Sequence, residues 1–339
     1  MNATMKKGEK ENKADKEKRK TKKPFIGFIG QGFIGKNYAD DFENRGYEVV
    51  RYAMEEPYRK NKEKIKKCDI VFIAVPTPST PKGFDYSIVE SVLALVGKGK
   101  TAVIKSTILP GTTERLRKKY PNIFVIHSPE FLREKTAAYD AAHPNRNIIG
   151  IPQETPDYRE RAERVMRILP RAEFERIMHA RDAELVKYGG NCFLYFKVIF
   201  TNVLYDLSSV TGVNWKDVRD TIAADPCIGA SHMEPIHSSG HTPGKVGRGA
   251  GGHCFIKDFA AFALLYEQEL RDPLGVKVLE ALRDKNDELL RTSGKDLDLL
   301  EGVYGKKGGN GFAHPTSRLR RGFGGQAILP SKEGRRKSL

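Results

Sequence analysis

The sequence has few cysteines and no long apolar run. Its 339 residues include four cysteines, which lie far apart and form no Cys-x-x-Cys pair. This spacing argues against a zinc ribbon and against a disulfide framework, so we predict no metal site and a reducing compartment. No apolar stretch approaches the roughly 20 residues that a membrane-spanning helix needs, and the N-terminus lacks the apolar core of a signal peptide. We therefore predict a cytoplasmic protein without a membrane span.

Hydrophobic residues are also scarce, at 39% of the chain, and the shortage is concentrated at the two ends. Residues 1–23 hold ten lysines and arginines against four acidic residues, and residues 303–339 hold nine against one. Of the formal net charge of +16, only about +2 therefore belongs to the middle of the chain. Segments of this composition cannot bury enough apolar surface to fold. We predict disordered basic tails over 1–23 and 293–339 with a solubilising role, and we do not expect nucleic acid as a partner.

A dinucleotide-binding pattern begins directly after the first basic tail. Residues 25–29 form a short apolar run typical of a strand, and a helical pattern follows and ends near Gly46. Such a strand-turn-helix unit can bring backbone N–H groups close to a pyrophosphate and point a helix N-terminus at its charge. The turn has the spacing Gly-x-Gly-x-x-Gly, and its predicted cofactor contacts are Gly30, Gln31, Gly32, Phe33, Ile34 and Gly35.

The end of the second strand bears on the identity of the cofactor. Residues 48–52 are typical of a strand, and in dinucleotide-binding folds an acidic residue near the end of this strand accepts hydrogen bonds from the ribose hydroxyls. That position holds Ala53 here, and Arg51 stands close by. The sequence therefore predicts NAD as the cofactor, with NADP as the open alternative.

Strand and helix patterns then alternate along the chain. Short apolar runs typical of buried strands occur at 69–75, 101–105, 122–127 and 147–151. Alternation of this kind predicts an α/β fold with a Rossmann-like, doubly wound parallel sheet, which we assign to residues 24–180. Ligands of such sheets bind at the carboxyl ends of the strands. Two loops at strand ends are therefore candidate cofactor contacts, through Val75, Pro76, Thr77, Pro78, Ser106 and Thr107.

The second half of the chain is predicted to be helical. One long helix over 183–207 is apolar almost all round, which predicts that it is covered on every side at a domain or dimer junction. Lys187 and Asn191 interrupt it four residues apart and so share one face. A buried amine and a buried amide need partners, which favours a site over a lysine that reaches the surface. We predict an α-helical dimerisation domain over 181–292 and a homodimer through the long helix.

A cysteine in a glycine-rich stretch is the candidate nucleophile. Residues 249–258 read Gly-Ala-Gly-Gly-His-Cys-Phe-Ile-Lys-Asp, so Cys254 follows the glycines. Glycines let the backbone approach a ligand closely and place the next side chain at the tip of a turn. Lys257 would supply a positive field that holds the sulfur as a thiolate. The alternative is a surface loop in which the cysteine has no chemical role.

In their order along residues 24–270, these motifs resemble those of the UDP-glucose/GDP-mannose dehydrogenase family. The motifs are the glycine turn, Val75-Pro76-Thr77-Pro78, Lys105-Ser106-Thr107-Ile108, Ser128-Pro129-Glu130-Phe131-Leu132-Arg133-Glu134, Lys187 with Asn191, and Gly251-Gly252-His253-Cys254-Phe255-Ile256-Lys257-Asp258. Members oxidise the 6-hydroxymethyl of a nucleotide sugar to a carboxylate in two steps, with two molecules of NAD. The resemblance implies this activity, a nucleotide-sugar substrate and NAD.

The resemblance also implies roles for single residues. Cys254 would attack the intermediate aldehyde, and hydride loss from the thiohemiacetal would give a thioester. Lys187 and Asn191 would face the developing oxyanion, where a fixed cation in a water-poor site has its largest effect.

The active-site water and the final hydrolysis of the thioester would involve further residues. Asp258 and Thr107 would order or activate the water, and Glu130 would act as a general base. Further family positions would contact the dinucleotide at Ser106, Glu134 and Lys257, and the substrate at Phe131, Leu132, Lys187, Asn191 and Gly251.

The sequence departs from the family pattern in three places. Ala250 stands where an aromatic residue is usual, and Cys227 replaces an arginine before Ile228. Full-length members carry a C-terminal second Rossmann-like domain that binds the substrate's nucleotide, and we expect no counterpart after about residue 292. Two alternatives therefore stay open. One is a non-catalytic module for NAD binding and dimerisation, and the other is a single-step hydroxyacid-type dehydrogenase, against which Cys254 argues.

Overall fold

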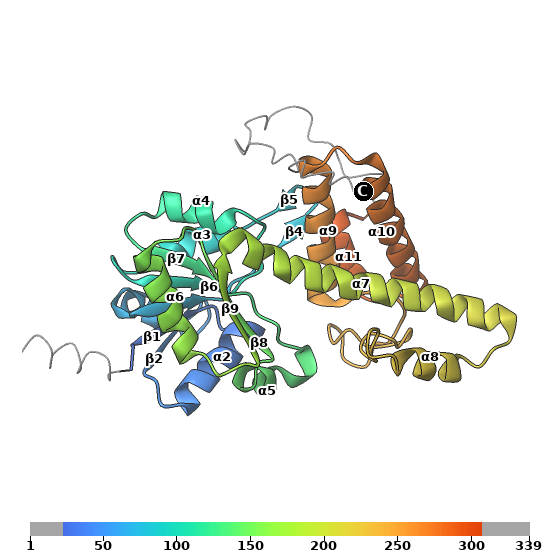
Figure 1. The fold of residues 1–339 in the computed structure, drawn as a ribbon, viewed down its shortest axis with the longest axis horizontal. Coiled ribbons are helices and arrows are strands. Elements are labelled where there is room, and N and C mark those ends of the chain that lie inside the picture. Colours follow the sequence, from blue (N-terminus) through green and yellow to red (C-terminus); the bar gives the residue numbers. More distant parts are fainter. Residues whose placement is uncertain (1–22, 307–339) are drawn as a thin grey trace, which may run out of the picture.

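The computed structural model describes residues 23–306. A part that contains a sheet and a part made of helices lie side by side, and the long helix α7 extends from one to the other (Figure 1). Within the described residues, no helix is both long enough and apolar enough to cross a membrane. Most of the two predicted tails, 1–22 and 307–339, lies outside the described residues.

Seven strands form the main sheet, in the order β2-β1-β3-β6-β7-β8-β9. Along the chain they are β1 Ile26–Ile29, β2 Val49–Tyr52, β3 Ile70–Ile73, β6 Thr101–Ile104, β7 Phe124–His127, β8 Arg146–Ile151 and β9 Phe174–His179. Strands β1, β3 and β6 are buried along their whole length. This is typical of the centre of a parallel sheet with helices on both faces, and the predicted Rossmann-like α/β fold is confirmed.

The sheet is not parallel throughout, in contrast to the prediction. Strand β8 runs antiparallel to β7, with His127 opposite Gly150, and β9 is parallel to β8. The six-residue helix α5 (Ala137–Ala142) between β7 and β8 is too short to run back along the sheet as a crossover helix. Strand β9 escapes prediction because it is partly exposed and includes Glu175 and Arg176, as edge strands often do.

Helices cover both faces of the sheet and enclose two apolar clusters. Helices α2, α5 and α6 pack on one face, and η1, α3 and α4 pack on the other. On the first face, the rings of Phe28 and Phe72 stack with centroids 5.0 Å apart, and Phe42 meets Phe28 edge-on at 5.5 Å. The elements here are α2 Phe33–Asn44, η1 Arg59–Lys67, β4 Ser79–Thr80, β5 Gly83–Phe84, α3 Ser87–Leu93, α4 Thr112–Lys119, η2 Glu134–Thr136, α5 Ala137–Ala142 and α6 Pro156–Ile168.

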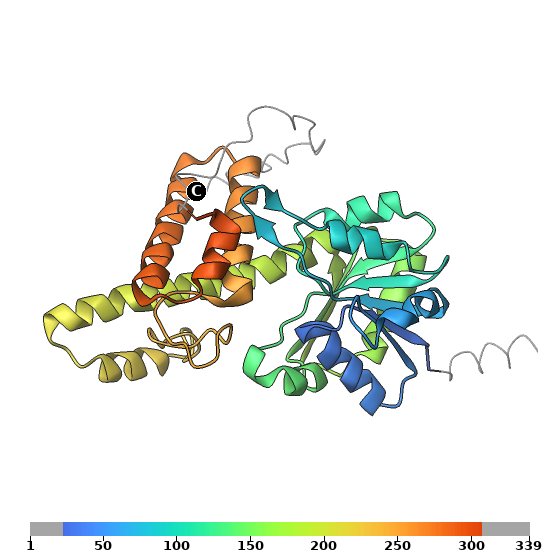
Figure 2. The same cartoon turned by 180° about the vertical axis from the view of Figure 1, so that it is seen from behind.

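The helical part is built around α7 and α9. Their contact includes the stacked rings of Tyr195 and Phe259, whose centroids are 4.1 Å apart. Seen from behind, α11 lies beside α9 and α10 (Figure 2). The helices are α7 Ala180–Thr211, α8 Trp215–Ala223, α9 Gly252–Glu269, α10 Pro273–Ser293 and α11 Leu297–Tyr304.

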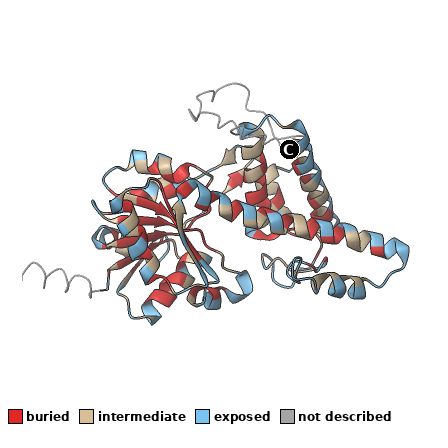
Figure 3. Cartoon of the chain, in the orientation of Figure 1, coloured by how far each residue is buried: buried red, intermediate tan, exposed pale blue. Residues whose placement is uncertain are grey.

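Helix α7 is not covered on all sides within one chain, although its composition predicts this. Large apolar side chains are exposed along one face, including Phe193 at 69%, Phe200 at 63% and Leu207 at 57%. Their spacing of seven residues places them in one row along the helix. Exposed stretches are visible along α7 in Figure 3.

The predicted start of the C-terminal tail is wrong. Residues 297–304 form α11, and Leu300 is buried at 1% exposure. The two residues before this helix, Lys295 and Asp296, are also buried. The prediction of disorder rests on the Gly, Lys and Arg content of the sequence after about residue 292, but Lys295 and Asp296 are held in hydrogen bonds inside the fold.

A buried carboxylate ties α7 to the sheet-containing part. Glu184 on α7 is fully buried and accepts hydrogen bonds from the N–H of Gly111 at 2.5 Å and of Thr113 at 2.8 Å. The Thr113 hydroxyl donates a third, at 2.6 Å. These donors lie at the N-terminus of α4, where a negative charge is favourable. Glu184 therefore fixes α7 against the loop that follows β6.

We expect Glu184 to make the stability of the chain depend on pH. Burial outweighs the three hydrogen bonds and raises the pKa of Glu184 from 4.5 to about 7. The folded chain therefore holds this proton more tightly than the unfolded chain. The stability from this group is present below about pH 4.5 and is lost as the pH rises through about 7.

Urea unfolding of Glu184→Gln at about pH 5 and pH 8 tests this dependence. Glutamine does not titrate, so the variant should lose less free energy of unfolding between the two pH values than the wild type, by about 1–3 kcal/mol. Glu173→Gln, at an exposed position before β9, should follow the wild type. The same pH dependence in Glu184→Gln and in the wild type would contradict the assignment.

Candidate active site

Strand β1 enters α2 through the predicted glycine turn, and the fold itself requires two of the glycines. Gly30 has a φ of +91°, and a Cβ there would lie 2.2 Å from the carbonyl oxygen of Ala74. A Cβ on Gly35 would lie 1.9 Å from the carbonyl oxygen of Gly30. Gly32 is different, because a Cβ there would meet nothing within 4 Å. It is the N-cap of α2 and places no side chain over the first N–H groups of the helix, which fits the pyrophosphate of NAD.

We expect Gly32→Ala to separate cofactor binding from folding. Gly32 has a φ of −72°, which alanine adopts readily, so Tm should fall by no more than about 3 °C. The new methyl would stand beside the start of α2, and the Kd for NADH should rise about tenfold or more. Fluorescence titration with NADH measures this. Gly302→Ala on α11, also in open space, is the control, and equal NADH affinity in both variants would contradict the turn's role.

The two predicted loops at the strand ends are joined to each other. The Ser106 hydroxyl accepts a hydrogen bond from the N–H of Val75 at 3.0 Å and donates one to its carbonyl oxygen at 2.7 Å. The Thr77 hydroxyl donates to the carbonyl oxygen of Thr107 at 2.8 Å. Strands β3 and β6 are neighbours, so their loops end at the same edge as the glycine turn. The structure therefore brings the predicted cofactor residues of these loops together.

The end of β2 favours NAD over NADP. Arg51, which kept NADP open, lies with Nη2 2.7 Å from Asp40 Oδ1 and 2.7 Å from Glu43 Oε2. A 2′-phosphate would have to compete with both carboxylates for this guanidinium. Ala53 is buried at 6% exposure and offers no side-chain acceptor to the ribose.

The Lys187 side chain on α7 forms a buried ion pair with Glu130. Its Nζ donates to Glu130 Oε1 at 2.9 Å and to the Glu130 carbonyl oxygen at 2.8 Å. Burial acts to lower the pKa of Lys187, but the negative groups around it, with Glu130 first, raise it above the ordinary value. The lysine is therefore a fixed cation. An ammonium has three N–H donors, and among the described residues two are used by Glu130.

One turn further along α7, Asn191 contacts the buried carboxylate of Asp258. The Asn191 Nδ2 donates to Asp258 Oδ2 at 2.6 Å, and Lys257 Nζ donates to Oδ1 at 2.5 Å. Asp258 is only 1% exposed, so these two contacts offset the loss of its hydration. The same face of α7 thus holds an ammonium and an amide, as the spacing of four residues predicts.

Cys254 lies in the first turn of α9, which begins at Gly252, and not at the tip of a loop as predicted. As a whole residue, Cys254 is exposed in the single chain. Desolvation by the surrounding protein raises the pKa of the Cys254 thiol above its ordinary value, and the negative charge of Asp258 raises it further. The positive charges of Lys187 and Lys257 lower this pKa, but by less. The expectation that Lys257 holds a thiolate is therefore wrong for the chain without ligands. Lys257 is paired with Asp258, and the negative charge of Asp258 opposes the effect of Lys257 on the pKa of the thiol.

Leu132 and Phe131 contact this group, whereas Glu134 lies against the loop at Gly240. The N–H of Leu132 donates to Glu130 Oε2 at 2.8 Å. The Lys187 ammonium lies 5.6 Å from the ring centroid of Phe131. Glu134 begins η2, and the loop at Gly240 lies against its carboxylate.

Two further buried side chains lie beside the candidate residues. Asn286 is outside every sequence motif, and Lys105 belongs to the motif at 105–108 but has no role predicted from the sequence. Asn286 on α10 accepts a hydrogen bond from the N–H of Ala250 at 2.6 Å and donates one to its carbonyl oxygen at 3.1 Å, which fixes the chain just before Cys254. Lys105 lies 4.4 Å from the ring centroid of Tyr38 and donates to the Ser128 hydroxyl at 3.1 Å. Burial lowers the pKa of Lys105 to about 8. Both contacts join residues far apart in sequence, so spacing does not reveal them.

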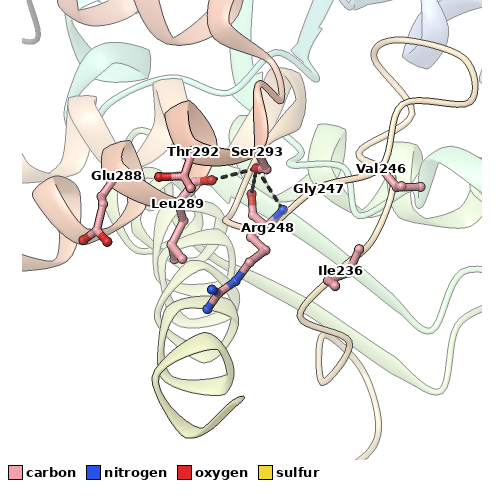
Figure 4. A pocket seen from close by; sticks show the side chains of 8 residues that line it. All are labelled: Ile236, Val246, Gly247, Arg248, Glu288, Leu289, Thr292 and Ser293. Atoms are coloured by element: carbon pink, nitrogen blue, oxygen red, sulfur yellow. Dashed lines mark hydrogen bonds between the residues drawn. The ribbon is translucent and has the colours of Figure 1, made fainter. Parts of the chain in front are cut away.

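A separate cavity of about 330 Å³ contains none of the candidate residues. It lies between the loop before Cys254 and α10, and its wall is formed by Ile236, Val246, Gly247, Arg248, Glu288, Leu289, Thr292 and Ser293 (Figure 4). Ser293 lies between α10 and the loop, and its hydroxyl accepts a hydrogen bond from the N–H of Arg248 at 3.0 Å. Across residues 23–306, no three His, Cys, Asp or Glu side chains gather in a way that could hold a metal ion.

Two models of one protein family match the chain. The family model described as UDP-glucose/GDP-mannose dehydrogenase family, NAD binding domain, matches residues 55–169, and the model for the family's central domain matches residues 181–288. The chain belongs to the UDP-glucose/GDP-mannose dehydrogenase family. Its cofactor is NAD. The first match begins after the glycine turn, so the role of that turn rests on the geometry of Gly30, Gly32 and Gly35.

The chain is similar to UDP-glucose dehydrogenases from bacteria and an archaeon. A putative UDP-glucose 6-dehydrogenase of Bacillus subtilis is 30% identical over 265 residues, which cover 73% of this chain and 57% of that protein. A UDP-glucose 6-dehydrogenase of Pseudomonas aeruginosa is 33% identical over 243 residues, 67% of this chain and 51% of that protein. The solved UDP-glucose dehydrogenase of Pyrobaculum islandicum superposes with a TM-score of 0.66 at 27% identity, over 83% of this chain and 71% of that chain. The chain spans only a little more than half the length of these two curated relatives.

Proposed function

We propose that the chain is an NAD-dependent dehydrogenase that oxidises the 6-hydroxymethyl of a nucleotide sugar to a carboxylate. Residues 24–180 would bind NAD, and residues 181–306 would form the helical domain. The observation that carries the proposal is the cysteine beside a fixed cation, Lys187, and a buried carboxylate, Asp258. Oxidation of an aldehyde to a carboxylate needs a nucleophile that adds to the carbonyl carbon. Cys254 therefore favours two oxidations over the single-step hydroxyacid-type reaction.

In the first oxidation the alcohol carbon loses a hydride and its hydroxyl loses a proton, which gives an aldehyde. Each of two NAD molecules would accept one hydride when bound, one in this oxidation and one in the next. Asp258 and Thr107 would order the water that takes the proton. The remaining N–H of Lys187 and the amide of Asn191 would stabilise the oxygen as its negative charge grows.

In the second oxidation the Cys254 sulfur adds to the aldehyde carbon. The S–H proton moves to the carbonyl oxygen, and the product is a thiohemiacetal. Loss of a second hydride from the carbon and of the hydroxyl proton gives a thioester. The sulfur is a thiol before substrate arrives, so the cations Lys187 and Lys257 would assist its deprotonation at the moment of attack.

Hydrolysis would then release the product. Glu130 would remove a proton from the water that attacks the thioester carbon, the C–S bond would break, and the thiol would be restored with a carboxylate as the product. One Glu130 oxygen is held by Lys187 and the other by the Leu132 N–H, so the carboxylate is already oriented. Phe131, Leu132 and Gly251 would contact the sugar nucleotide, and Glu134 would contact NAD.

Turnover with a panel of sugar nucleotides tests the proposal. Purified protein is incubated with NAD and UDP-glucose, GDP-mannose or their N-acetylated relatives, and NADH is followed by absorbance and the sugar product by mass spectrometry. We expect a uronate product from at least one sugar nucleotide. Binding of NAD without oxidation of any sugar would instead indicate the non-catalytic module, and an aldehyde as the end product would indicate the single-step reaction.

The proposed active form is a homodimer that pairs through α7. The row of exposed side chains at Phe193, Phe200 and Leu207 continues with Val203 at 46% and Val210 at 81% exposure. A row with this heptad spacing fits the same row on a second helix. In such a dimer the apolar side chains of both rows would be buried against each other, and removal of this area from water would stabilise the dimer.

We expect Phe200→Glu to separate the two subunits. A charge in the middle of the apolar row would be buried without a partner in the dimer. Sedimentation equilibrium should give the mass of two chains for the wild type and of one chain for the variant. Val278→Glu, which replaces an exposed apolar residue on α10, should remain dimeric. A wild type that sediments as one chain, or a dimeric Phe200→Glu, contradicts this arrangement.

A further inference from the structure

Two buried charged residues in front of α11 contact the backbone that leads to Cys254. Lys295 is fully buried and Asp296 is 4% exposed. Both lie beyond residue 288, where the match to the family's central domain ends. Neither residue belongs to the cysteine motif.

Lys295 holds the loop from one side. Its Nζ donates to the carbonyl oxygen of Gly249 at 2.9 Å and to that of Gly247 at 3.3 Å. It also lies 3.1 Å from Nε2 of His237. A buried ammonium is costly unless its donors are used, and here it links three points of the loop.

Asp296 holds the same loop at the start of α9. Its Oδ2 accepts a hydrogen bond from the N–H of Gly252 at 2.8 Å, and its Oδ1 accepts one from the Ser239 hydroxyl at 3.0 Å. Asp296 has a φ of +54°, which is unfavourable for a residue with a Cβ. Strain of this kind persists where the surrounding structure holds it in place.

The glycines before Cys254 leave the space that this pair occupies. A Cβ on Gly251 would lie 2.0 Å from Asp296 Oδ2, and a Cβ on Gly247 would lie 2.9 Å from Lys295 Cβ. The glycine-rich composition therefore has a second physical reason besides close approach to a ligand. It admits two charged side chains against the backbone.

A second connection runs through histidines on the exposed side of the loop. His253, next to Cys254, has Nε2 3.1 Å from Nδ1 of His241, and Nε2 of His241 lies 2.7 Å from Asp298 Oδ2. Asp298 stands in the first turn of α11. The N-terminal end of α11 thus meets the cysteine region from two directions.

We propose that Lys295 and Asp296 are positioning residues that fix the backbone at 247–252 and so set the place of the Cys254 sulfur relative to Lys187 and Asp258. The proposal rests on the proposed function for its catalytic consequence. Neither residue touches the reacting atoms. They act through the Gly249 carbonyl and the Gly252 N–H. A nucleophile displaced by about 1 Å loses roughly 100-fold in rate, so loss of either contact should lower turnover strongly.

Hydrogen exchange tests the positioning role without any substrate. In Asp296→Ala and Lys295→Met, the amides of 249–254 should exchange about tenfold faster than in the wild type, or more, while the strands of the main sheet keep their protection. Asp296→Asn keeps an acceptor for the Gly252 N–H and should restore most of the protection. Glu301→Ala, on α11 but outside this network, is the matched control.

Turnover and thiol labelling complete the test. In a Cys227→Ser background, Cys254 is the exposed cysteine and Cys68 and Cys192 are buried, so labelling of one thiol per chain by iodoacetamide reports an intact fold. Labelling is done on a separate sample, because alkylated Cys254 cannot react. When that sample shows one labelled thiol, turnover of unlabelled Asp296→Ala should fall about 100-fold with the NADH Kd within about twofold, and unlabelled Asp296→Asn should recover to within about tenfold of wild type.

The outcomes are distinguishable. Labelling of three thiols in Asp296→Ala would mean that this variant has unfolded. The positioning role is then judged from hydrogen exchange and turnover in Asp296→Asn and Lys295→Met. Wild-type exchange at 249–254 in all folded variants, or faster exchange with unchanged turnover, overturns the proposal. If the wild type oxidises no sugar nucleotide, the proposed function is contradicted. The hydrogen-exchange rates at 249–254 still show whether Lys295 and Asp296 hold the loop in place.

Discussion

Cys254→Ser is expected to stop the reaction at the aldehyde. The serine hydroxyl is a far weaker nucleophile than a thiol near neutral pH, and no base is hydrogen-bonded to this position in the described structure. Formation of the carboxylate should fall by roughly three orders of magnitude or more. The first hydride transfer does not use the sulfur, so it should survive. Product analysis by mass spectrometry, with the aldehyde trapped by hydroxylamine, measures both steps.

The second exposed cysteine provides the control. Cys227 is exposed like Cys254 but lies in the loop after α8, away from Lys187 and Asp258. Cys227→Ser should keep both oxidations within about twofold of wild type. Carboxylate formation by Cys254→Ser at more than about a tenth of the wild-type rate would exclude a thioester route.

Lys187→Met is expected to cause the second large loss. The side chain is 7% exposed and its ammonium neutralises Glu130, so the substitution leaves a buried carboxylate without its cation. Breaking a buried pair in this way costs about 3–5 kcal/mol of unfolding free energy. Loss of a charge that faces the developing oxyanion should lower kcat by about 10²–10³. Urea unfolding and steady-state kinetics measure the two effects.

A double variant separates stability from chemistry. In Lys187→Met/Glu130→Gln the buried negative charge is removed as well, and most of the lost unfolding free energy should return. Activity should stay at or below that of the single variant, because neither the cation nor the general base is present. Recovery of activity together with stability would show that Lys187 acts only through the fold.

Much of the fold can be predicted from local patterns. The glycine turn and the buried strand runs specify the start of the Rossmann-like sheet because each pattern lies within a few residues of chain. The direction of β8 could not be predicted, since it depends on how far the short α5 carries the chain. Strand β9 is missed because an edge strand does not need a continuous apolar run.

In the candidate site, too, local spacing predicts some features, and contacts between distant parts of the chain determine the others. The spacing of Lys187 and Asn191 correctly predicts one shared face of α7, and each side chain finds its partner there. The pairing of Lys257 with Asp258 is also local, but its effect on the Cys254 thiol depends on burial, which spacing does not give. Composition misplaces the start of the C-terminal tail, because Lys295 and Asp296 are buried by contacts with a loop more than 40 residues earlier in the chain.

The number of NADH molecules formed per sugar nucleotide consumed tests the central claim most directly. The measurement uses limiting sugar nucleotide, excess NAD, and wild type beside Cys254→Ser. The account predicts two NADH per sugar for the wild type, with a uronate as the product, and no more than one for Cys254→Ser. One NADH per sugar for the wild type, or two for the variant, would contradict it.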